Sequence, residues 1–282
     1  MIAVGGMPRG PVRCPLTVGY RSFMPQTEIN GHPLYFEDTG GDGPTVLLSH
    51  GYLMDHEMFE PQVAALVPAY RVITWDQRGF GQTPADAPFT YWDSARDAFG
   101  ILDHLGIAGA VFGGMSQGGF LSLRAALLEP ERVSALALID TQAGPEDPAS
   151  IPAYEGMLAE WRANGPEAVQ EIVASIILGS DIDWAPWFKK WSAIPREQIE
   201  MPFRCMVDRD DVTERLGEIT CPSIVFHGDA DAAIPMDRAE ALRDGLPGCE
   251  ELVVVKGGSH AANLSHPAQV NPPLRAFLER NA

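Results

Sequence analysis

The chain has 282 residues, 45% of them hydrophobic, and its 38 acidic against 20 basic residues give a formal net charge of −18 at pH 7. This length suits one α/β domain with an insertion better than two unrelated domains. The charge argues against a nucleic-acid partner, because such affinity comes mostly from Lys and Arg neutralising phosphates, and no basic cluster is present.

Four cysteines are scattered along the chain, and their spacing matches no metal site. They are therefore expected to be free thiols in a reducing compartment, which favours the cytoplasm. No apolar run approaches the roughly 18 residues of a membrane span. We expect a small-molecule substrate and neither a membrane partner, a metal nor a cofactor. The cysteines are Cys14, Cys205, Cys221 and Cys249.

The N-terminal part of the chain divides into an extension and a hairpin. Residues 1–25 are rich in Gly, Pro and Arg and are expected to form a poorly packed extension. Residues 28–38 are predicted to form a short hairpin, because Asn30-Gly31 is a strong turn dipeptide between runs that alternate apolar and polar.

A short apolar strand predicted at 45–49 runs directly into His50-Gly51-Tyr52. A strand that ends at glycine can offer a backbone N–H to a ligand above the sheet. We therefore assign the functional role at this position to the Tyr52 amide. The His50 side chain is expected to be buried and to tie the loop together.

A helix near 59–66 and a strand at 71–75 are predicted next. The loop that follows contains Asp76 and Arg78, which are expected to brace it rather than to react. Apolar residues then recur at helical spacing over 91–105, and Gly106 ends the pattern.

A glycine-rich segment, Gly113-Gly114-Met115-Ser116-Gln117-Gly118-Gly119, lies between the apolar run 108–112 and the apolar-periodic run 120–128. A serine in such a strand-to-helix turn can be held outward on a sharp bend, and the glycines on either side avoid collisions with neighbouring backbone. The segment is therefore a candidate nucleophile elbow.

The rest of the chain continues the alternation after one long interruption. A strand is predicted at 133–139, no strand is expected over 141–217, and strands resume at 223–227 and 251–255. The interruption shows helical periodicity and is predicted to form a helical insertion. A last helix at 267–280 should be kinked or interrupted by Pro272-Pro273.

This alternation of strands and helices predicts an α/β fold with a mostly parallel central sheet flanked by helices. The core would comprise residues 26–140 and 218–282, and the helical insertion residues 141–217.

A serine hydroxyl needs a base, and the base needs an acid that fixes its tautomer. Of the seven histidines, His260 alone follows a strand through a glycine-rich turn near the C-terminus, whereas His266 is expected to begin a helix. The loop after 223–227 offers Asp229 and Asp231, of which Asp229 is interpreted as a turn former.

These motifs resemble those of the α/β-hydrolases, in the branch with serine esterases, 3-oxoadipate enol-lactonases and cofactor-free perhydrolases. The resemblance runs from residue 29 to the C-terminus. The matching motifs, in the family's order, are His50-Gly51, Asp76-x-Arg78-Gly79-x-Gly81, Gly114-x-Ser116-x-Gly118-Gly119, Gly228-x-x-Asp231-x-x-x-Pro235 and Gly258-x-His260.

The resemblance implies Ser116 as nucleophile, His260 as base, Asp231 as acid, and the amides of Tyr52 and Gln117 as oxyanion hole. It also implies that the helical insertion, residues 141–217, forms a cap over the pocket. Some relatives take the acid from the end of the preceding central strand, which here would be Asp140.

The resulting hypothesis is a serine hydrolase that cleaves a small, mainly apolar carboxylic ester or lactone through an acyl-enzyme. One alternative is a carbon–carbon bond hydrolase of the meta-cleavage type, although such enzymes usually carry a longer glycine run near His50 and a Trp at the position of Ala261. The other is a ligand sensor of the same fold that keeps an intact triad.

The cap is rich in large apolar side chains, and a bulky aromatic stripe includes Trp184, Trp187 and Trp191. At least one ring of this stripe is expected to face the space above Ser116. These three tryptophans and Met157 are therefore the predicted substrate-binding residues.

Overall fold

The computed structural model describes residues 26–282, so the predicted extension 1–25 lies outside the described residues. Its centre is a seven-stranded sheet of order β3-β5-β4-β6-β7-β8-β9, parallel except for β3 at one edge. The strands are β3 (Phe36–Asp38), β4 (Thr45–Ser49), β5 (Arg71–Trp75), β6 (Ala110–Met115), β7 (Val133–Ile139), β8 (Ser223–Gly228) and β9 (Cys249–Val255).

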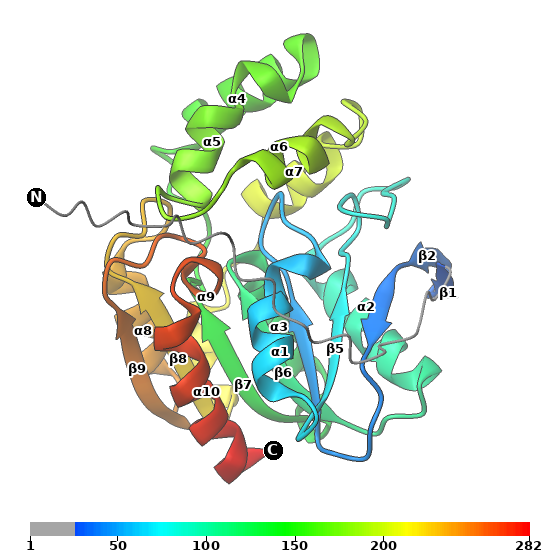
Figure 1. Cartoon of the computed structure of the whole chain (residues 1–282), viewed down its shortest axis with the longest axis vertical. Coiled ribbons are helices and arrows are strands. Elements are labelled where there is room, and N and C mark those ends of the chain that lie inside the picture. The colour runs from blue at the N-terminus through cyan, green and yellow to red at the C-terminus, as the bar shows by residue number, and fades with distance from the viewer. Residues whose placement is uncertain (1–25) are drawn as a thin grey trace, which may run out of the picture.

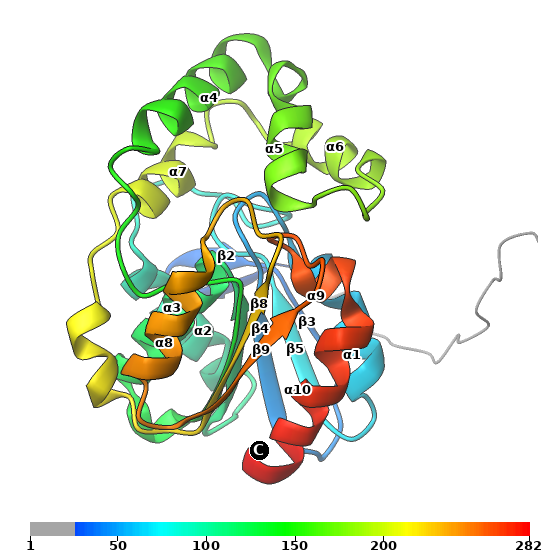
Figure 2. The ribbon, with the colours of Figure 1, turned by 90° about the vertical axis from the view of Figure 1, so that its left-hand side faces the viewer.

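Helices cover both faces of this sheet, which explains why the central strands are continuous apolar runs. Figure 2 shows α2, α3 and α8 on one face and α1, α9 and α10 on the other. The first group is α2 (Tyr91–His104), α3 (Gln117–Leu128) and α8 (Met236–Gly245). The second group is α1 (Glu60–Leu66), α9 (Ala262–Ser265) and α10 (Pro267–Asn281).

The predicted hairpin is present but shorter than expected. β1 (Thr27–Ile29) and β2 (His32–Leu34) pair antiparallel around Asn30 and Gly31, both of which have positive φ. The residues after β2 leave the hairpin and enter the main sheet as β3, antiparallel to β5. The predicted turn is therefore confirmed, whereas the end of the predicted second strand belongs to another sheet.

The prolines Pro272 and Pro273 were predicted to kink or interrupt the last helix; α10 continues through both, so the predicted interruption is wrong. The two prolines lie in the second turn of the helix. Their missing N–H groups remove only the bonds to the carbonyls of Ala268 and Gln269, and the buried residues Val270, Leu274 and Phe277 hold the helix against the sheet.

The segment between β7 and β8 contains helices and no strand in the described structure. Figure 1 shows its four α-helices above the carboxyl ends of the parallel strands. They are α4 (Ile151–Asn164), α5 (Gln170–Ile177), α6 (Ala185–Ser192) and α7 (Glu200–Val207). Across residues 26–282, no helix is both long and apolar enough to cross a membrane.

The loop after β5 is braced as expected. Asp76 accepts hydrogen bonds from the backbone N–H groups of His56 and Gln82, at 2.9 and 2.8 Å. The Arg78 guanidinium forms a bidentate pair with Asp97 of α2, with N–O distances of 2.6 and 2.8 Å, and the Asp97 side chain is fully buried.

Replacing Asp97 with Ala should lower the free energy of unfolding by about 3–5 kcal/mol, because it leaves the Arg78 charge buried without a partner. Urea denaturation followed by circular dichroism measures this change. The exposed pair of Arg215 and Glu218 provides the control, since Glu218→Ala should leave the midpoint unchanged. Equal midpoints for the two variants would show that the buried pair does not brace the loop.

Candidate active site

Ser116 occupies a sharp turn between β6 and α3, with φ 51° and ψ −114°, a conformation that costs energy for a residue with a Cβ. Its backbone N–H donates to the Ile139 carbonyl at 2.9 Å, and its carbonyl accepts from the Thr141 hydroxyl at 2.7 Å. The turn is therefore fixed by the neighbouring strand β7 and the residues that follow it.

The glycines beside Ser116 are required by close backbone contact. A Cβ on Gly118 would lie 1.8 Å from the Ser49 carbonyl oxygen, and one on Gly114 would lie 2.1 Å from the Gly118 carbonyl carbon. No side chain fits at these distances. The glycine-rich segment thus lets α3 begin directly against β4 and β6.

His260 and Asp231 meet above the ends of β8 and β9. The distance between His260 Nδ1 and Asp231 Oδ2 is 2.8 Å. The other Asp231 oxygen accepts from the backbone N–H groups of Ala233 and Ile234, at 2.7 and 3.0 Å, which fixes the carboxylate. Asp231 is therefore oriented to hold the His260 ring with Nδ1 protonated.

The turn in this loop is formed by Asp231 itself. Asp229, which we interpreted as the turn former, instead accepts from the backbone N–H of Gly257 at 2.6 Å. This correction gives Asp229 a different structural role, since it joins the loop after β8 to the loop after β9.

Asp140, the alternative acid, lies directly after β7 and does not contact His260. Its two carboxylate oxygens accept from the backbone N–H groups of Gly228 and Ala262, at 2.8 and 2.9 Å. Asp140 therefore ties β7 to the loops after β8 and β9, and of the two candidate acids the structure brings only Asp231 to His260.

The pKa shifts of Asp140 and Asp231 also favour Asp231 as the carboxylate partner of His260. Burial and the negative charge of Asp231 raise the pKa of Asp140 well above its ordinary value. Burial also opposes ionisation of Asp231, but the charge and hydrogen bond of His260 outweigh it and lower the Asp231 pKa. Burial lowers the pKa of His260, but the charge and hydrogen bond of Asp231, together with the charges of Asp140 and Glu146, raise it above its ordinary value. Asp231 is thus the carboxylate that stabilises a protonated imidazole.

Asp140, His227 and Asp231 also place one possible metal-ligand atom each within 4.8 Å of one another. All four carboxylate oxygens of this group already accept hydrogen bonds, from backbone amides or from His260. These bonds already account for the orientation of both carboxylates without a metal ion.

The two amides of the predicted oxyanion hole come from different elements. Gln117 is the first residue of α3, where the helix dipole is positive, and Tyr52 follows β4. Within residues 26–282, neither backbone N–H donates to a protein acceptor. Both groups are therefore available to a bound oxygen.

His50 is structural, as expected. It is buried, and its Nε2 accepts from the backbone N–H of Gln77 at 2.9 Å. The Gln77 side chain returns a hydrogen bond to the His50 carbonyl at 2.6 Å. This pair joins the loop after β4 to the loop after β5 and supports the Tyr52 backbone. His266, as expected, begins α10.

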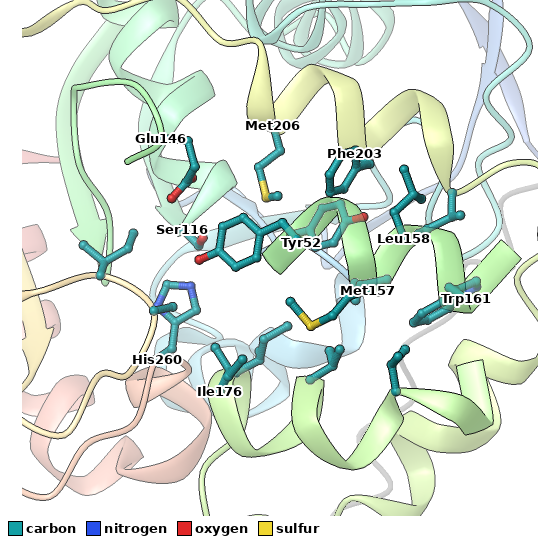
Figure 3. Close-up of a pocket in the computed structure, with 18 of the residues that line it drawn as sticks. Tyr52, Ser116, Glu146, Met157, Leu158, Trp161, Ile176, Phe203, Met206 and His260 are labelled. Carbon is teal, nitrogen blue, oxygen red and sulfur yellow. The ribbon is translucent and has the colours of Figure 1, made fainter. Parts of the chain in front are cut away.

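Ser116 and His260 line the same cavity, in which Figure 3 places them together at one end. The Ser116 hydroxyl makes no hydrogen bond to another residue of the described chain. Such contacts often tighten only when substrate binds. The remaining wall is largely apolar and comes mainly from α4, α5 and α7; it includes Tyr154, Met157, Leu158, Trp161, Val173, Ile176, Phe203 and Met206.

Of the four predicted substrate-binding residues, the structure places only Met157 in the cavity wall. Trp184, Trp187 and Trp191 do not line it, so the expectation that a ring of the α6 stripe faces Ser116 is not met. The Trp191 indole N–H donates to the Leu53 carbonyl at 2.6 Å, and that of Trp184 donates to the Gly179 carbonyl at 2.7 Å.

The physical reason is that α6 fastens the cap to the core. Lys190 forms ion pairs with Asp55 and Glu57, both at 2.6 Å, and its ammonium lies 4.7 Å from the centre of the Trp187 ring. These contacts and the Trp191 bond reach the loop that carries Tyr52. The aromatic stripe therefore attaches the cap to the core and does not line the cavity.

Several residues of the cavity wall were not among the predicted substrate-binding residues, and only some of them follow a recognisable sequence pattern. Tyr154, Leu158 and Trp161 share a helical stripe with Met157, and this periodicity could have identified them. Glu146 lies in a loop without periodicity, and no pattern marks it as part of the cavity.

Comparisons with known proteins agree with this architecture. Residues 44–181 match the family model described as the alpha/beta hydrolase fold. A Variovorax paradoxus protein named "Putative carbamate hydrolase RutD" is 32% identical, over 88% of this chain and 97% of that protein.

Two solved structures are also similar. One is a thermophilic esterase from Thermogutta terrifontis, with a TM-score of 0.80, 28% identity and coverage of 88% of this chain and 94% of that one. The other is the enol-lactonase from Burkholderia xenovorans LB400, with a TM-score of 0.83, 25% identity and coverage of 90% and 100%. The predicted fold is confirmed, and the chain belongs to the α/β-hydrolase fold family.

Proposed function

We propose that this hydrolase cleaves a small, mainly apolar carboxylic ester or lactone with Ser116 as nucleophile. The observation that carries the proposal is the His260–Asp231 hydrogen bond beside the strained Ser116 turn, at one end of an apolar cavity. The similarity to an esterase and to an enol-lactonase supports cleavage at a carbonyl carbon.

In the proposed mechanism, His260 removes the hydroxyl proton of Ser116 as its oxygen attacks the carbonyl carbon. The Tyr52 and Gln117 amides donate to the oxyanion that forms, and Asp231 stabilises the protonated imidazole. His260 then gives the proton to the leaving oxygen, which departs as an alcohol. A water molecule, deprotonated by His260, attacks the acyl-enzyme, and His260 returns the proton to Ser116 as the acid is released.

The RutD relative makes carbamates a second substrate class to screen. The predominantly apolar wall favours a substrate with a larger apolar group, because each buried methylene contributes about 0.8 kcal/mol.

The two alternative functions, a carbon–carbon bond hydrolase and a ligand sensor, are distinguished by experiment. A carbon–carbon bond hydrolase acts on vinylogous diketones. A sensor turns over an activated ester slowly and only once.

Ser116→Ala should reduce steady-state hydrolysis of a 4-nitrophenyl ester by a factor on the order of 10³–10⁶, because it removes the nucleophile. Melting temperature should show that the fold is retained. Ser175→Ala is the matched control, since this exposed cap serine bonds only the Ile172 carbonyl. Full activity in a folded Ser116→Ala protein contradicts the proposal.

Asp231→Asn should lower kcat by about 10⁴, through loss of the acceptor that orients His260. Asp140→Asn should lower it much less, because Asp140 contacts backbone amides and not the imidazole. Initial rates of the two purified variants on the same ester give the comparison. A larger loss in Asp140→Asn would transfer the role of acid to Asp140.

A neutral ester should have a higher kcat/KM than its analogue with a terminal carboxylate on the acyl chain. Apart from Glu146 and His260, the residues of the cavity wall carry no ionisable charge at neutral pH, and none is Lys or Arg. Rates for the pair at equal acyl length measure the preference. A preference for the carboxylate would instead favour a dicarboxylate-type enol-lactonase.

A further inference from the structure

Glu146 places a carboxylate in the wall of an otherwise apolar cavity. Its Oε2 lies 2.9 Å from Arg209 Nη1, and its side chain is 13% exposed. The other carboxylate oxygen accepts no hydrogen bond from any residue of the described chain. In Figure 3 the carboxylate points toward the end of the cavity that holds Ser116. One oxygen of Glu146 is thus an unused acceptor beside the nucleophile.

Arg209 fixes this carboxylate. Its side chain is 1% exposed and donates to the carbonyls of Gly144 and Met206, at 3.0 and 2.8 Å, and its guanidinium lies 4.3 Å from the centre of the Phe120 ring. The pair carries no net charge, so Glu146 acts on a ligand chiefly as an oriented acceptor.

The two ends of the cavity differ in polarity. Figure 3 shows Glu146, Ser116 and His260 at one end and Trp161 at the other. His260 protonates the leaving oxygen at the polar end, and an apolar acyl chain is buried most favourably at the apolar end, so we assign the leaving group to the polar end. The acyl chain then extends among the apolar side chains of α4, α5 and α7.

We propose that Glu146 is a specificity-determining residue that accepts a hydrogen bond from a hydroxyl or N–H group on the leaving group of the substrate. The preferred substrate is then an ester that joins an apolar acyl group to an alcohol carrying a further donor. This inference rests on the proposed function. A buried acceptor left without its donor disfavours the analogue that lacks the group.

The test compares 2-hydroxyethyl hexanoate with propyl hexanoate, which differ by a hydroxyl in place of a methyl group. The selectivity is the ratio of kcat/KM for the two esters, so changes in His260 that affect both esters cancel. Glu146→Met should lower this ratio by about 10-fold relative to the unmodified protein, whereas Glu146→Gln, which keeps an acceptor oxygen, should retain most of it.

Glu155→Met is the matched control, because Glu155 forms a comparable pair with Arg204 on the outside of the cap. It should leave the ratio unchanged. If Glu146→Met fails to fold because Arg209 loses its partner, Glu146→Met combined with Arg209→Met removes both charges. An equal ratio in the unmodified protein and in folded Glu146→Met, or in the folded double variant, overturns the inference.

Binding separates this inference from the proposed function. In a Ser116→Ala background the same two esters bind without cleavage, and calorimetry gives a Kd for each. The hydroxyl-bearing ester should bind about 10-fold tighter, and adding Glu146→Met should abolish the difference. Loss of this preference with normal ester turnover overturns the role of Glu146 alone. Absence of turnover with the preference intact overturns the proposed reaction alone.

Discussion

The site depends on one steric constraint, the positive φ of Ser116 at the junction of β6 and α3. The conformation is strained, and it persists because β7 and Thr141 hold the turn from both sides. A Cβ atom would lie 1.8 Å from neighbouring backbone at Gly118 and 2.1 Å from it at Gly114, so no side chain fits at either position. The same turn presents the serine above the sheet and begins α3, so the Gln117 amide lies beside it.

Different helices of the cap line the cavity and attach the cap to the core. Helices α4, α5 and α7 supply the apolar wall, whereas α6 attaches the cap to the loop after β4 through Trp191 and Lys190. Since that loop also carries the Tyr52 amide, the position of the cap and the geometry of the proposed oxyanion hole are coupled. A displacement of α6 would disturb both.

Charge near Ser116 is distributed so that each buried carboxyl group has a different partner. Asp231 is paired with His260, Asp140 is bonded to two backbone amides, and Glu146 is paired with Arg209. Burying a charge without a partner costs free energy, and giving each carboxyl group its own hydrogen-bond partner reduces this cost. It leaves one carboxylate oxygen, on Glu146, for a substrate.

The sequence by itself determined the alternation of strands and helices, the glycine-rich turn around Ser116 and the order of the motifs, because these depend on neighbours along the chain. The tertiary structure decided which carboxylate meets His260, since Asp140 and Asp231 both follow buried strands. It also decided which aromatic stripe faces the cavity, since the stripes of α4 and α6 both have helical spacing. It also joined Glu146 to Arg209, 63 residues apart, a contact that packing of the cap creates and no local pattern encodes.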